Sequence, residues 1–421
     1  MTEVLAEAPW ANAADSPRIT SVRTFLTAPQ GLPTLVARVE TDVPGLYGLG
    51  CGSDPQRTRA VRSVIDDHLG PMVIGRRAGD IEDIHRLMLN SGYWRGGSIA
   101  GNAIGAIDVA LWDIAAKSAG LPLYAMLGGR AREFAATYSH VDGTDAAEIA
   151  DKVLERMAQG YRHVRVQAAV RGSDTYGTAA VDGEEHRRRR ERSGRWDSQT
   201  YVRTVPKVLA EVRERVGWDV ELLHDAHHRL DPAQARQFAV DLEPVGLFFL
   251  EDVLAAEDVA WFPQLRAATS TPLAVGEVFS DIHQFLPLLA TRSIDFVRVR
   301  VPTLGGLTPV RKLVAAAELF GIRTAPHGPA DVSPVGQAAQ LALDISTPNF
   351  GVQEAAPFAD ATREVFPGTY VAEHGVLRPS ERPGLGVDFD EALAARYPAP
   401  EPLDHDRWAM LRSSDGSVQR P

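Results

Sequence analysis

Three acidic residues end three successive strand-like segments at a constant interval. Asp225 ends DVELLHD, Glu251 ends LFFLE and Glu277 ends LAVGE, and each of the last two lies 26 residues after the one before it. That interval accommodates one strand, one helix and two short loops, so the three carboxylates should converge at one end of a parallel barrel. Three oxygen ligands on a rigid rim suit Mg²⁺ better than zinc or copper. The spacing therefore predicts a metal-dependent enzyme.

The rest of the chain extends this series in both directions. After Gly128 and Gly129, short apolar runs alternate with helical segments, which is typical of a parallel sheet built from βαβ units. The predicted strands are 134–139, 161–167, 218–225, 246–251, 272–277, 294–301, 321–327 and 349–354. Asp231-Pro232 and Thr308-Pro309 each place a capping side chain before a proline, so a helix is expected to begin at each proline.

The N-terminal part has a different pattern of predicted secondary structure. Residues 18–50 are β-rich and broken by Pro and Gly, and helical periodicity follows at 57–69, 81–90 and 101–119. We therefore expect an α/β protein, a modified TIM (β/α)7–8 barrel with an α+β capping domain. Its expected parts are a disordered tail at 1–17, the capping domain at 18–128, the barrel at 129–370, and a C-terminal segment at 371–421 that packs on the capping domain.

Composition excludes several classes of function. The chain has 421 residues and a formal charge of −11, which argues against nucleic-acid binding, and its one basic run, Arg187 to Arg190, is flanked by glutamates. The single cysteine, Cys51, excludes an intrachain disulfide and fits a reducing compartment. The sequence shows no 18-residue apolar stretch and no secretory pattern at its start, so we expect no membrane partner and a cytoplasmic protein.

The segment HDAHHR offers a candidate acid. On a continuing strand Asp225 and His227 would point the same way, toward the barrel mouth, while His224 and His228 would face away. An imidazole beside a metal-bound carboxylate can deliver a proton to a leaving hydroxyl. The alternative is that these histidines are loop residues with ordinary partners.

The segment YRHVRVQ offers a candidate for base catalysis. It places Arg165 and Gln167 on one face, and Tyr176 follows eleven residues after Arg165 in a long loop. A nearby guanidinium stabilises a phenolate, which can then remove a proton. Equally, Arg165 can be a structural ion-pair partner of a neighbouring metal carboxylate, and the spacing alone does not choose between these interpretations.

Further polar residues fall at predicted strand ends. Together with the three carboxylates, such a rim suits a polyhydroxylated acid whose hydroxyls need several fixed partners. The glycine-rich segments GGLTPV and GYWRGG lack the context of a phosphate or dinucleotide loop. The strand-end candidates are His140, Arg298, His327, Asp331 and Glu354.

The two-domain layout and the motifs HDAHHR, FFLED, TPLAVGEVF, HGPADVSP and PNFGVQE resemble the enolase superfamily, and within it the mannonate dehydratase group. The resemblance runs from about Arg18 to Asp415. It implies Mg²⁺ held by Asp225, Glu251 and Glu277, and dehydration of D-mannonate or D-gluconate to 2-keto-3-deoxy-D-gluconate. It also implies a homo-oligomer, either a tetramer or an octamer.

The resemblance also assigns roles to the other candidates. Tyr176 with Arg165 would remove the C2 proton, and His227 would protonate the departing C3 hydroxyl. In the capping-domain loop GCGSDPQR, Gln56 is a candidate where strongly active members carry asparagine. The positions that match substrate contacts in the family are His140, Arg298, His327, Asp331 and Glu354.

Some departures from the family pattern keep two alternatives open. The loop between Arg165 and Tyr176 is one residue shorter than is usual, Pro329 follows His327 by two residues, and a terminal tryptophan is absent. These departures favour a weak or silent relative that binds a ligand for sensing. An epimerase or racemase is less favoured, because Arg165 and Gln167 replace the lysine pair of such enzymes.

Overall fold

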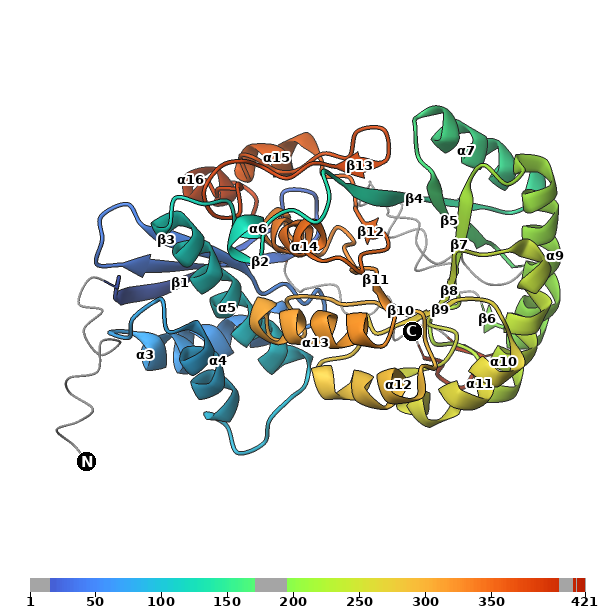
Figure 1. The fold of residues 1–421 in the computed structure, drawn as a ribbon, viewed down its shortest axis with the longest axis horizontal. Coiled ribbons are helices and arrows are strands. Elements are labelled where there is room, and N and C mark those ends of the chain that lie inside the picture. The colour runs from blue at the N-terminus through green and yellow to red at the C-terminus, as the bar shows by residue number, and fades with distance from the viewer. Residues whose placement is uncertain (1–15, 171–194, 401–411, 414, 421) are drawn as a thin grey trace.

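The computed structural model describes residues 16–170, 195–400, 412–413 and 415–420. A smaller body around an N-terminal sheet lies beside a larger body, in which a curved set of strands is surrounded by helices (Figure 1). The predicted architecture, a parallel barrel with an α+β capping domain, is confirmed. The expected tail at 1–17 falls almost entirely outside the described residues.

The capping domain is built on a three-stranded antiparallel sheet. The strands β1 (Ile19–Thr27), β2 (Thr34–Thr41) and β3 (Tyr47–Cys51) pair in the order β1-β2-β3. A continuous helical stretch follows, made of α2 (Thr58–Ser63), a π-helical turn (Val64–Leu69) and α3 (Gly70–Val73). The remaining helices of this part are α4 (Ile81–Asn90), α5 (Ser98–Ser118) and α6 (Leu123–Met126).

Helix α5 is packed between the capping sheet and the barrel. On the sheet side a Cβ at Gly50 would stand 1.7 Å from the carbonyl oxygen of Ala106, so only glycine permits this approach. On the barrel side a Cβ at Gly101 would stand 1.9 Å from the carbonyl oxygen of Thr303. The prediction of no 18-residue apolar stretch is wrong, because this helix is long and apolar enough to cross a membrane, but 83% of its apolar window is buried inside the structure.

Eight parallel strands form the barrel. They are β4 (Ala135–Gly143), β5 (His163–Ala168), β7 (Glu221–Asp225), β8 (Phe249–Glu251), β9 (Leu273–Val275), β10 (Phe296–Val297), β11 (Arg323–Thr324) and β12 (Gln353–Glu354). Hydrogen-bonded neighbours run in the order β11-β10-β9-β8-β7-β5-β4-β12. A parallel bridge between Thr324 and Phe350 joins the two ends of this order, which closes the barrel.

Helices cover the outside of the barrel, as Figure 1 shows for α7 and α9 to α12. The α-helices are α7 (Ala146–Ala158), α9 (Ser198–Val216), α10 (Pro232–Asp241), α11 (Phe262–Ala268), α12 (Leu286–Thr291), α13 (Leu307–Leu319) and α14 (Pro334–Ser346). Short 3₁₀ turns precede α11 and α12 and follow α10, at Ala256–Trp261, Ile282–Phe285 and Glu243–Val245. The two-residue strand β6 (Arg195–Trp196) lies just before α9.

The two predicted helix starts have different outcomes. Asp231 caps α10 with a complete capping box, in which its side chain accepts from the backbone N–H of Gln234, so this prediction is confirmed. The prediction at Thr308 is wrong, because α13 begins at Leu307. Its N-terminus is instead capped from the other domain, by Asp108 of α5, whose Oδ2 accepts from the Thr308 N–H at 3.0 Å.

The C-terminal segment returns to both bodies. The elements α15 (Asp360–Val365), β13 (Val376–Leu377) and α16 (Glu391–Ala394) follow the barrel, and β13 pairs with β4. In α16, Glu391 forms ion pairs with Arg23 and Arg38 of the capping sheet at 2.7 and 2.9 Å. By contrast, β14 (Arg412–Ser413) pairs with β6, so the described end of the chain lies against the barrel.

Asp344 makes the stability of the fold depend on pH. It lies on α14, is fully buried, and neither carboxyl oxygen has a hydrogen-bond partner among the described residues. Burial raises the pKa of Asp344 well above its ordinary value, and Arg132 offsets this only in part. The stability it contributes is present in full below the unfolded-state pKa, about 3.9, and is lost as pH rises toward the higher folded-state pKa.

We therefore expect Asp344→Asn to stabilise the protein relative to the native chain, by an amount that grows with pH. The growth can reach about 1.4 kcal/mol per pH unit between the unfolded-state and folded-state pKa. Urea unfolding midpoints at several pH values between 5 and 8 measure it, with Asp360→Asn as control because its side chain is 84% exposed. Parallel pH profiles for Asp344→Asn and the native chain would contradict this account.

Candidate active site

Two layers of inward-facing side chains fill the barrel. The lower layer is an apolar cluster contributed by five strands and by the residues adjacent to β11 and β12: Tyr138, Leu223, Phe249, Ala274, Phe296, Ala325 and Val352. Side chains two residues apart on a strand share a face, so the next inward positions lie toward the carboxyl ends of the strands. Those positions are polar: His140, Asp225, Glu251, Arg298, His327 and Glu354. The apolar layer is thus a floor beneath a charged site.

The three regularly spaced carboxylates all belong to this site. Asp225 and Glu251 are the last residues of β7 and β8, and they are 2% and 0% exposed. Glu277 lies two residues beyond β9 and is 7% exposed. Between β9 and Glu277, Gly276 has φ +130, and a Cβ there would overlap the ring of Phe285. Glycine therefore lets the chain turn and present Glu277.

Arg298 is the central cation of the site. It is fully buried, and its Nε donates to Glu251 at 2.6 Å while Nη2 donates to Glu354 at 2.9 Å. The remaining N–H groups go to the Tyr138 hydroxyl and to the carbonyl oxygens of Ala325 and Pro326. All five guanidinium donors are thus used within the protein, and Arg298 holds two carboxylates in fixed positions.

Arg165 of β5 lies among the same carboxylates. Its Nη1 is 3.4 Å from Glu251, 3.6 Å from Asp225 and 3.7 Å from Glu354. This agrees with the interpretation of Arg165 as an ion-pair partner of strand-end carboxylates. Tyr176, its predicted partner in base catalysis, lies outside the described residues.

Glu354 faces two histidines and both arginines. His140 Nε2 is 3.0 Å from its Oε1, and His327 Nε2 is 3.8 Å from its Oε2. Burial opposes its ionisation, but Arg165 and the neighbouring cations outweigh burial and hold the pKa of Glu354 well below its usual range. Burial lowers the pKa of both His140 and His327, which favours the neutral form of each imidazole.

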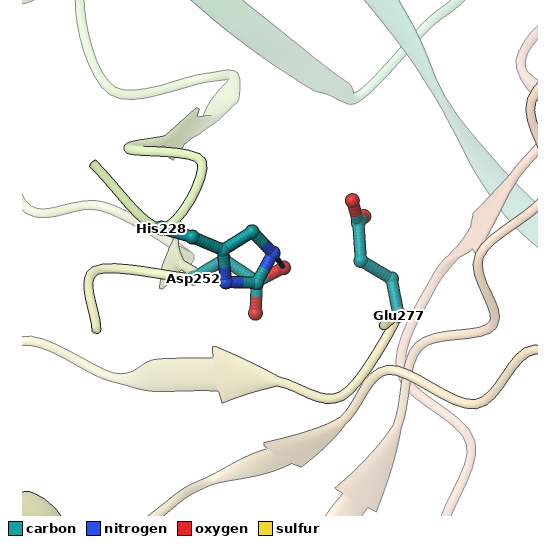
Figure 2. A group of neighbouring side chains, drawn as sticks. All are labelled: His228, Asp252 and Glu277. Atoms are coloured by element: carbon teal, nitrogen blue, oxygen red, sulfur yellow. Dashed lines mark ion pairs between the residues drawn. The ribbon is translucent and has the colours of Figure 1, made fainter. Parts of the chain in front are cut away.

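The two histidines after β7 do not continue the strand. Both take left-handed backbone angles, φ 52 for His227 and φ 61 for His228, so the period of two stops at Asp225. His227 still reaches the site, with Nε2 3.7 Å from Glu277. The expectation that His228 faces away is wrong, because its Nε2 lies 2.9 Å from Asp252, and Figure 2 shows this pair across from Glu277.

His224 has the outward position that was predicted for it. Its ring accepts from the Tyr201 hydroxyl at 2.6 Å and donates to the carbonyl oxygen of Val166 at 2.7 Å, an assignment that follows from its low pKa, about 4, caused by burial. Gln167 adds a bond to the Asp225 carbonyl oxygen at 3.1 Å. The backbone ladder between β5 and β7 ends at Arg165, so these side chains hold the strands together beyond it.

The electrostatics of the three carboxylates fit a divalent cation. Burial and the neighbouring Glu251 raise the pKa of Asp225 to about 8. Burial and the charges of Asp252 and Glu251 raise the pKa of Glu277 well above its ordinary value. Asp225 Oδ2 and Glu277 Oε2 are buried and accept no hydrogen bond from the described residues, although His327 Nε2 lies 3.2 Å from Glu277 Oε2. Crowded oxygen donors without enough protein partners form the ligand set that Mg²⁺ prefers.

Two predicted residues lie at the boundary with the capping domain. Gln56 is in the turn between β3 and α2, where its carbonyl oxygen accepts from Arg57. Asp331 lies between β11 and α14 and pairs with Arg300 at 2.9 Å. Among the described residues, no hydrogen bond or ion pair joins either one to the strand-end carboxylates.

Three residues of the site were not predicted from the sequence. Asp252 and Arg300 follow Glu251 and Arg298 closely, and the period of two along the strand would have placed Arg300 on the inward face. Tyr138, two residues before His140, could have been found by the same period. Asp252 had no such signal, because its left-handed backbone, φ 45, turns it toward His228.

Comparison with known proteins agrees with this architecture. Residues 6–128 match the mandelate racemase / muconate lactonizing enzyme N-terminal domain family, and residues 148–393 match the enolase C-terminal domain-like family. A D-galactonate dehydratase family member from Streptomyces sp. (strain SPB074) is 66% identical over 100% of this chain and 96% of its own length. The family member RspA from Pantoea ananatis is 43% identical over 96% of this chain and 99% of its own length.

Solved structures show the same fold. The crystal structure of an enolase from Pantoea ananatis with bound D-gluconate and Mg superposes with a TM-score of 0.88 at 41% identity, covering 96% of this chain and 100% of that one. A member of the enolase superfamily from Salmonella Typhimurium superposes with a TM-score of 0.79 at 26% identity, covering 91% and 98%. The chain therefore belongs to the enolase superfamily and, within it, to the D-galactonate dehydratase family.

Proposed function

We propose that the protein is a Mg²⁺-dependent sugar-acid dehydratase that converts D-gluconate or D-mannonate to 2-keto-3-deoxy-D-gluconate. The observation that carries this proposal is the ring of buried carboxylates at the strand ends, two of which keep oxygens that accept no hydrogen bond from the part of the chain that the structure describes. The family relationship supports the reaction class, and the related structure that binds D-gluconate and Mg supports the substrate class.

We assign the metal to Asp225, Glu251 and Glu277. A second group, His228, Asp252 and Glu277, also offers ligand atoms within 4.8 Å of one another (Figure 2). In that group His228 and Asp252 already pair at 2.9 Å, and Asp252 outweighs burial and raises the pKa of His228 to about 9. A protonated imidazole is no ligand, so the strand-end carboxylates are the better set.

Bound Mg²⁺ supplies positive charge that stabilises the negative charge developing on a substrate carboxylate. The proposed roles of the chain's own residues follow the order of proton transfers. Tyr176, with its phenolate stabilised by Arg165, takes the proton from C2. His227 gives a proton to the C3 hydroxyl, the C3–O bond breaks, and water leaves. The resulting enol tautomerises to the 2-keto-3-deoxy acid.

The substrate-binding roles divide into two sets. His140, His327 and Glu354 line the site beside the carboxylates, and Asp331 and Gln56 lie toward the capping domain. Arg298 was predicted to contact substrate, but each of its five donors is bonded within the protein. We therefore assign Arg298 to positioning Glu251 and Glu354.

The two proton-transfer roles predict different behaviour in D₂O. His227→Asn should lose product formation but keep exchange of the C2 hydrogen with solvent, because removal of that proton does not need the acid. Tyr176→Phe should lose both. Proton NMR of the substrate with Mg²⁺ present follows exchange and product together. Product formation at the native rate in either variant would show that the assigned roles are wrong.

A substrate panel tests the reaction class. Purified protein with Mg²⁺ is incubated with hexonic and pentonic acids, including D-gluconate, D-mannonate and D-galactonate, and 2-keto-3-deoxy product is measured. Turnover of D-gluconate or D-mannonate supports the proposal as stated. If no acid on the panel is turned over while calorimetry detects sugar-acid binding, the silent ligand-binding relative replaces it.

We also propose that the enzyme works as a homo-oligomer, a tetramer or octamer, in the cytoplasm. Tyr93 and Trp94, in the loop between α4 and α5, are 89% and 91% exposed, and a subunit contact would bury this aromatic area. Light scattering of the purified protein measures the assembly. A monomer at micromolar concentration would rule this assembly out.

A further inference from the structure

Arg300 connects three segments at the boundary between the two domains. It lies two residues beyond Arg298, after the end of β10, and is 6% exposed. Its Nη2 donates to the Ser53 carbonyl oxygen at 2.8 Å, Nη1 to Asp331 at 2.9 Å, and Nε to the Thr303 hydroxyl at 2.9 Å. One guanidinium therefore fixes a capping-domain loop and two barrel loops relative to one another.

The capping-domain loop held in this way is 52–57, which carries Gln56. Ser53 is fully buried, and its hydroxyl accepts from the Leu35 N–H of β2 at 3.1 Å. Asp54 then starts the turn into α2 by accepting from the Arg57 N–H at 3.1 Å. The loop is thus anchored to the capping sheet on one side and to Arg300 on the other, with Gln56 at its turn.

The barrel loop held by Arg300 is 328–333, which carries Asp331. Its ends are fixed by other contacts, since Gln337 donates to the Gly328 carbonyl oxygen at 2.9 Å and Ser333 caps α14. The Asp331 side chain is 16% exposed, and its one ion pair among the described residues is the one with Arg300. The direction in which Asp331 points therefore depends on Arg300.

We propose that Arg300 is a positioning residue for recognition of the sugar acid's hydroxyl chain at the end remote from the carboxylate. It holds Asp331 of the barrel and the Gln56 loop of the capping domain together as one wall of the site. This inference rests on the proposed function, in which Asp331 and Gln56 contact the substrate. It adds a residue and a linkage between domains that the proposed function does not contain.

The position of Arg300 decides which kinetic constant it affects. Among the described residues no ion pair or hydrogen bond joins Arg300 to Asp225, Glu251 or Glu277, the proposed metal ligands. Contacts to parts of a substrate that do not react stabilise the ground state and the transition state alike, so their loss raises KM more than it lowers kcat. A residue needed for the chemical step would show the opposite split.

The test compares Arg300→Met, Arg300→Lys, Asp331→Asn and the double variant Arg300→Met/Asp331→Asn. In Arg300→Met we expect KM for D-gluconate or D-mannonate to rise about tenfold to hundredfold, the loss expected for one charge-assisted hydrogen bond, with kcat falling less than about threefold. Arg300→Lys should restore part of the affinity, because an ammonium keeps one of the three contacts but cannot reproduce the fork. If Arg300→Met does not fold, Arg300→Lys is the variant whose KM and kcat are compared with those of the native protein.

The double variant tests whether Arg300 acts through Asp331. Two residues that share one contact are not additive, so the rise in KM of the double variant should be smaller than the product of the rises in Arg300→Met and Asp331→Asn. Fully multiplied effects would overturn the proposal. A fall in kcat at unchanged KM would overturn it as well.

Two further readouts do not require turnover. The Kd for D-gluconate, measured by calorimetry with Mg²⁺ present, should rise in Arg300→Met as KM does. Hydrogen–deuterium exchange should quicken in both 52–57 and 328–333. If the native protein turns over no acid, the proposed reaction is wrong. If the Kd for D-gluconate or the exchange in these loops is unchanged in Arg300→Met, the proposed role of Arg300 is wrong.

Arg213→Met is the matched control. Arg213 is 4% exposed, and its side chain donates hydrogen bonds to the backbone carbonyl oxygens of Val245, Gly217, Val220 and Gly246. Its removal should lower stability without changing KM, the Kd for D-gluconate or exchange in the two loops. An equal rise in KM in this control would mean that general destabilisation explains the effect, and the proposal would fail.

Discussion

Glu277→Gln is expected to lower turnover at least about a thousandfold and to remove stabilisation by Mg²⁺, while leaving the metal-free protein about as stable as the native chain. The loss corresponds to several kcal/mol of charge stabilisation in the transition state. The metal-free expectation follows because burial and neighbouring carboxylates raise the pKa of Glu277, so the fold disfavours the charged form of this side chain and a neutral glutamine of the same shape should fit in its place. Removal of a proposed metal ligand should therefore be visible only when metal is present.

Denaturant unfolding with and without Mg²⁺ makes this measurable. At free Mg²⁺ a hundred times the Kd, the native chain should gain about 2.7 kcal/mol and Glu277→Gln far less. Glu211→Gln is the surface control, because the Glu211 side chain is 53% exposed on α9. Asp225→Asn should behave like Glu277→Gln, whereas Asp252→Asn should keep the Mg²⁺ gain. If Asp225→Asn kept the Mg²⁺ gain and Asp252→Asn lost it, the metal would be assigned to the group drawn in Figure 2.

Arg298→Met is expected to cost about 3–5 kcal/mol of unfolding free energy, because it leaves buried carboxylates without their main partner. Glu251 and Glu354 are both at most 1% exposed and bond to this guanidinium at 2.6 and 2.9 Å. Arg165 stays near both but at 3.4 Å or more. Arg298→Lys should recover only part of the loss, since one ammonium cannot occupy all five bonds.

Urea unfolding of the Mg²⁺-loaded variants measures this cost. Arg215→Met serves as the control, because Arg215 also pairs with a glutamate, at 2.8 Å, but its side chain is 48% exposed. An exposed pair of this kind is worth at most about 1 kcal/mol. Equal losses of unfolding free energy in Arg298→Met and Arg215→Met would show that burial does not make the ion pairs of Arg298 more important for stability than an exposed pair.

The barrel and the positions of the three carboxylates were predictable from sequence because both follow from period and spacing. Successive strand–helix units of equal length place Asp225, Glu251 and Glu277 at the same edge, and β7, β8 and β9 end at or just before them. Inward-facing polar residues follow apolar ones by two positions, as in Tyr138 and His140. Rules of this kind depend on the local chain alone.

The parts that were not predictable depend on partners far away in sequence. The start of α13 is set by Asp108, 200 residues earlier, and not by the Thr308-Pro309 signal. The orientation of His228 follows from a left-handed backbone at the end of β7, where the strand period no longer applies. Arg300 has partners in both domains, and no local pattern identifies Ser53 as one of them.

The most direct measurement is the formation of 2-keto-3-deoxy-D-gluconate from D-gluconate and from D-mannonate, by native protein and by Glu277→Gln prepared side by side with Mg²⁺. The proposed function predicts product from at least one acid with the native protein, none above background with the variant, and none with the native protein after chelation of the metal. No product from either acid, or equal product with and without metal, would contradict a Mg²⁺-dependent dehydratase of these sugar acids.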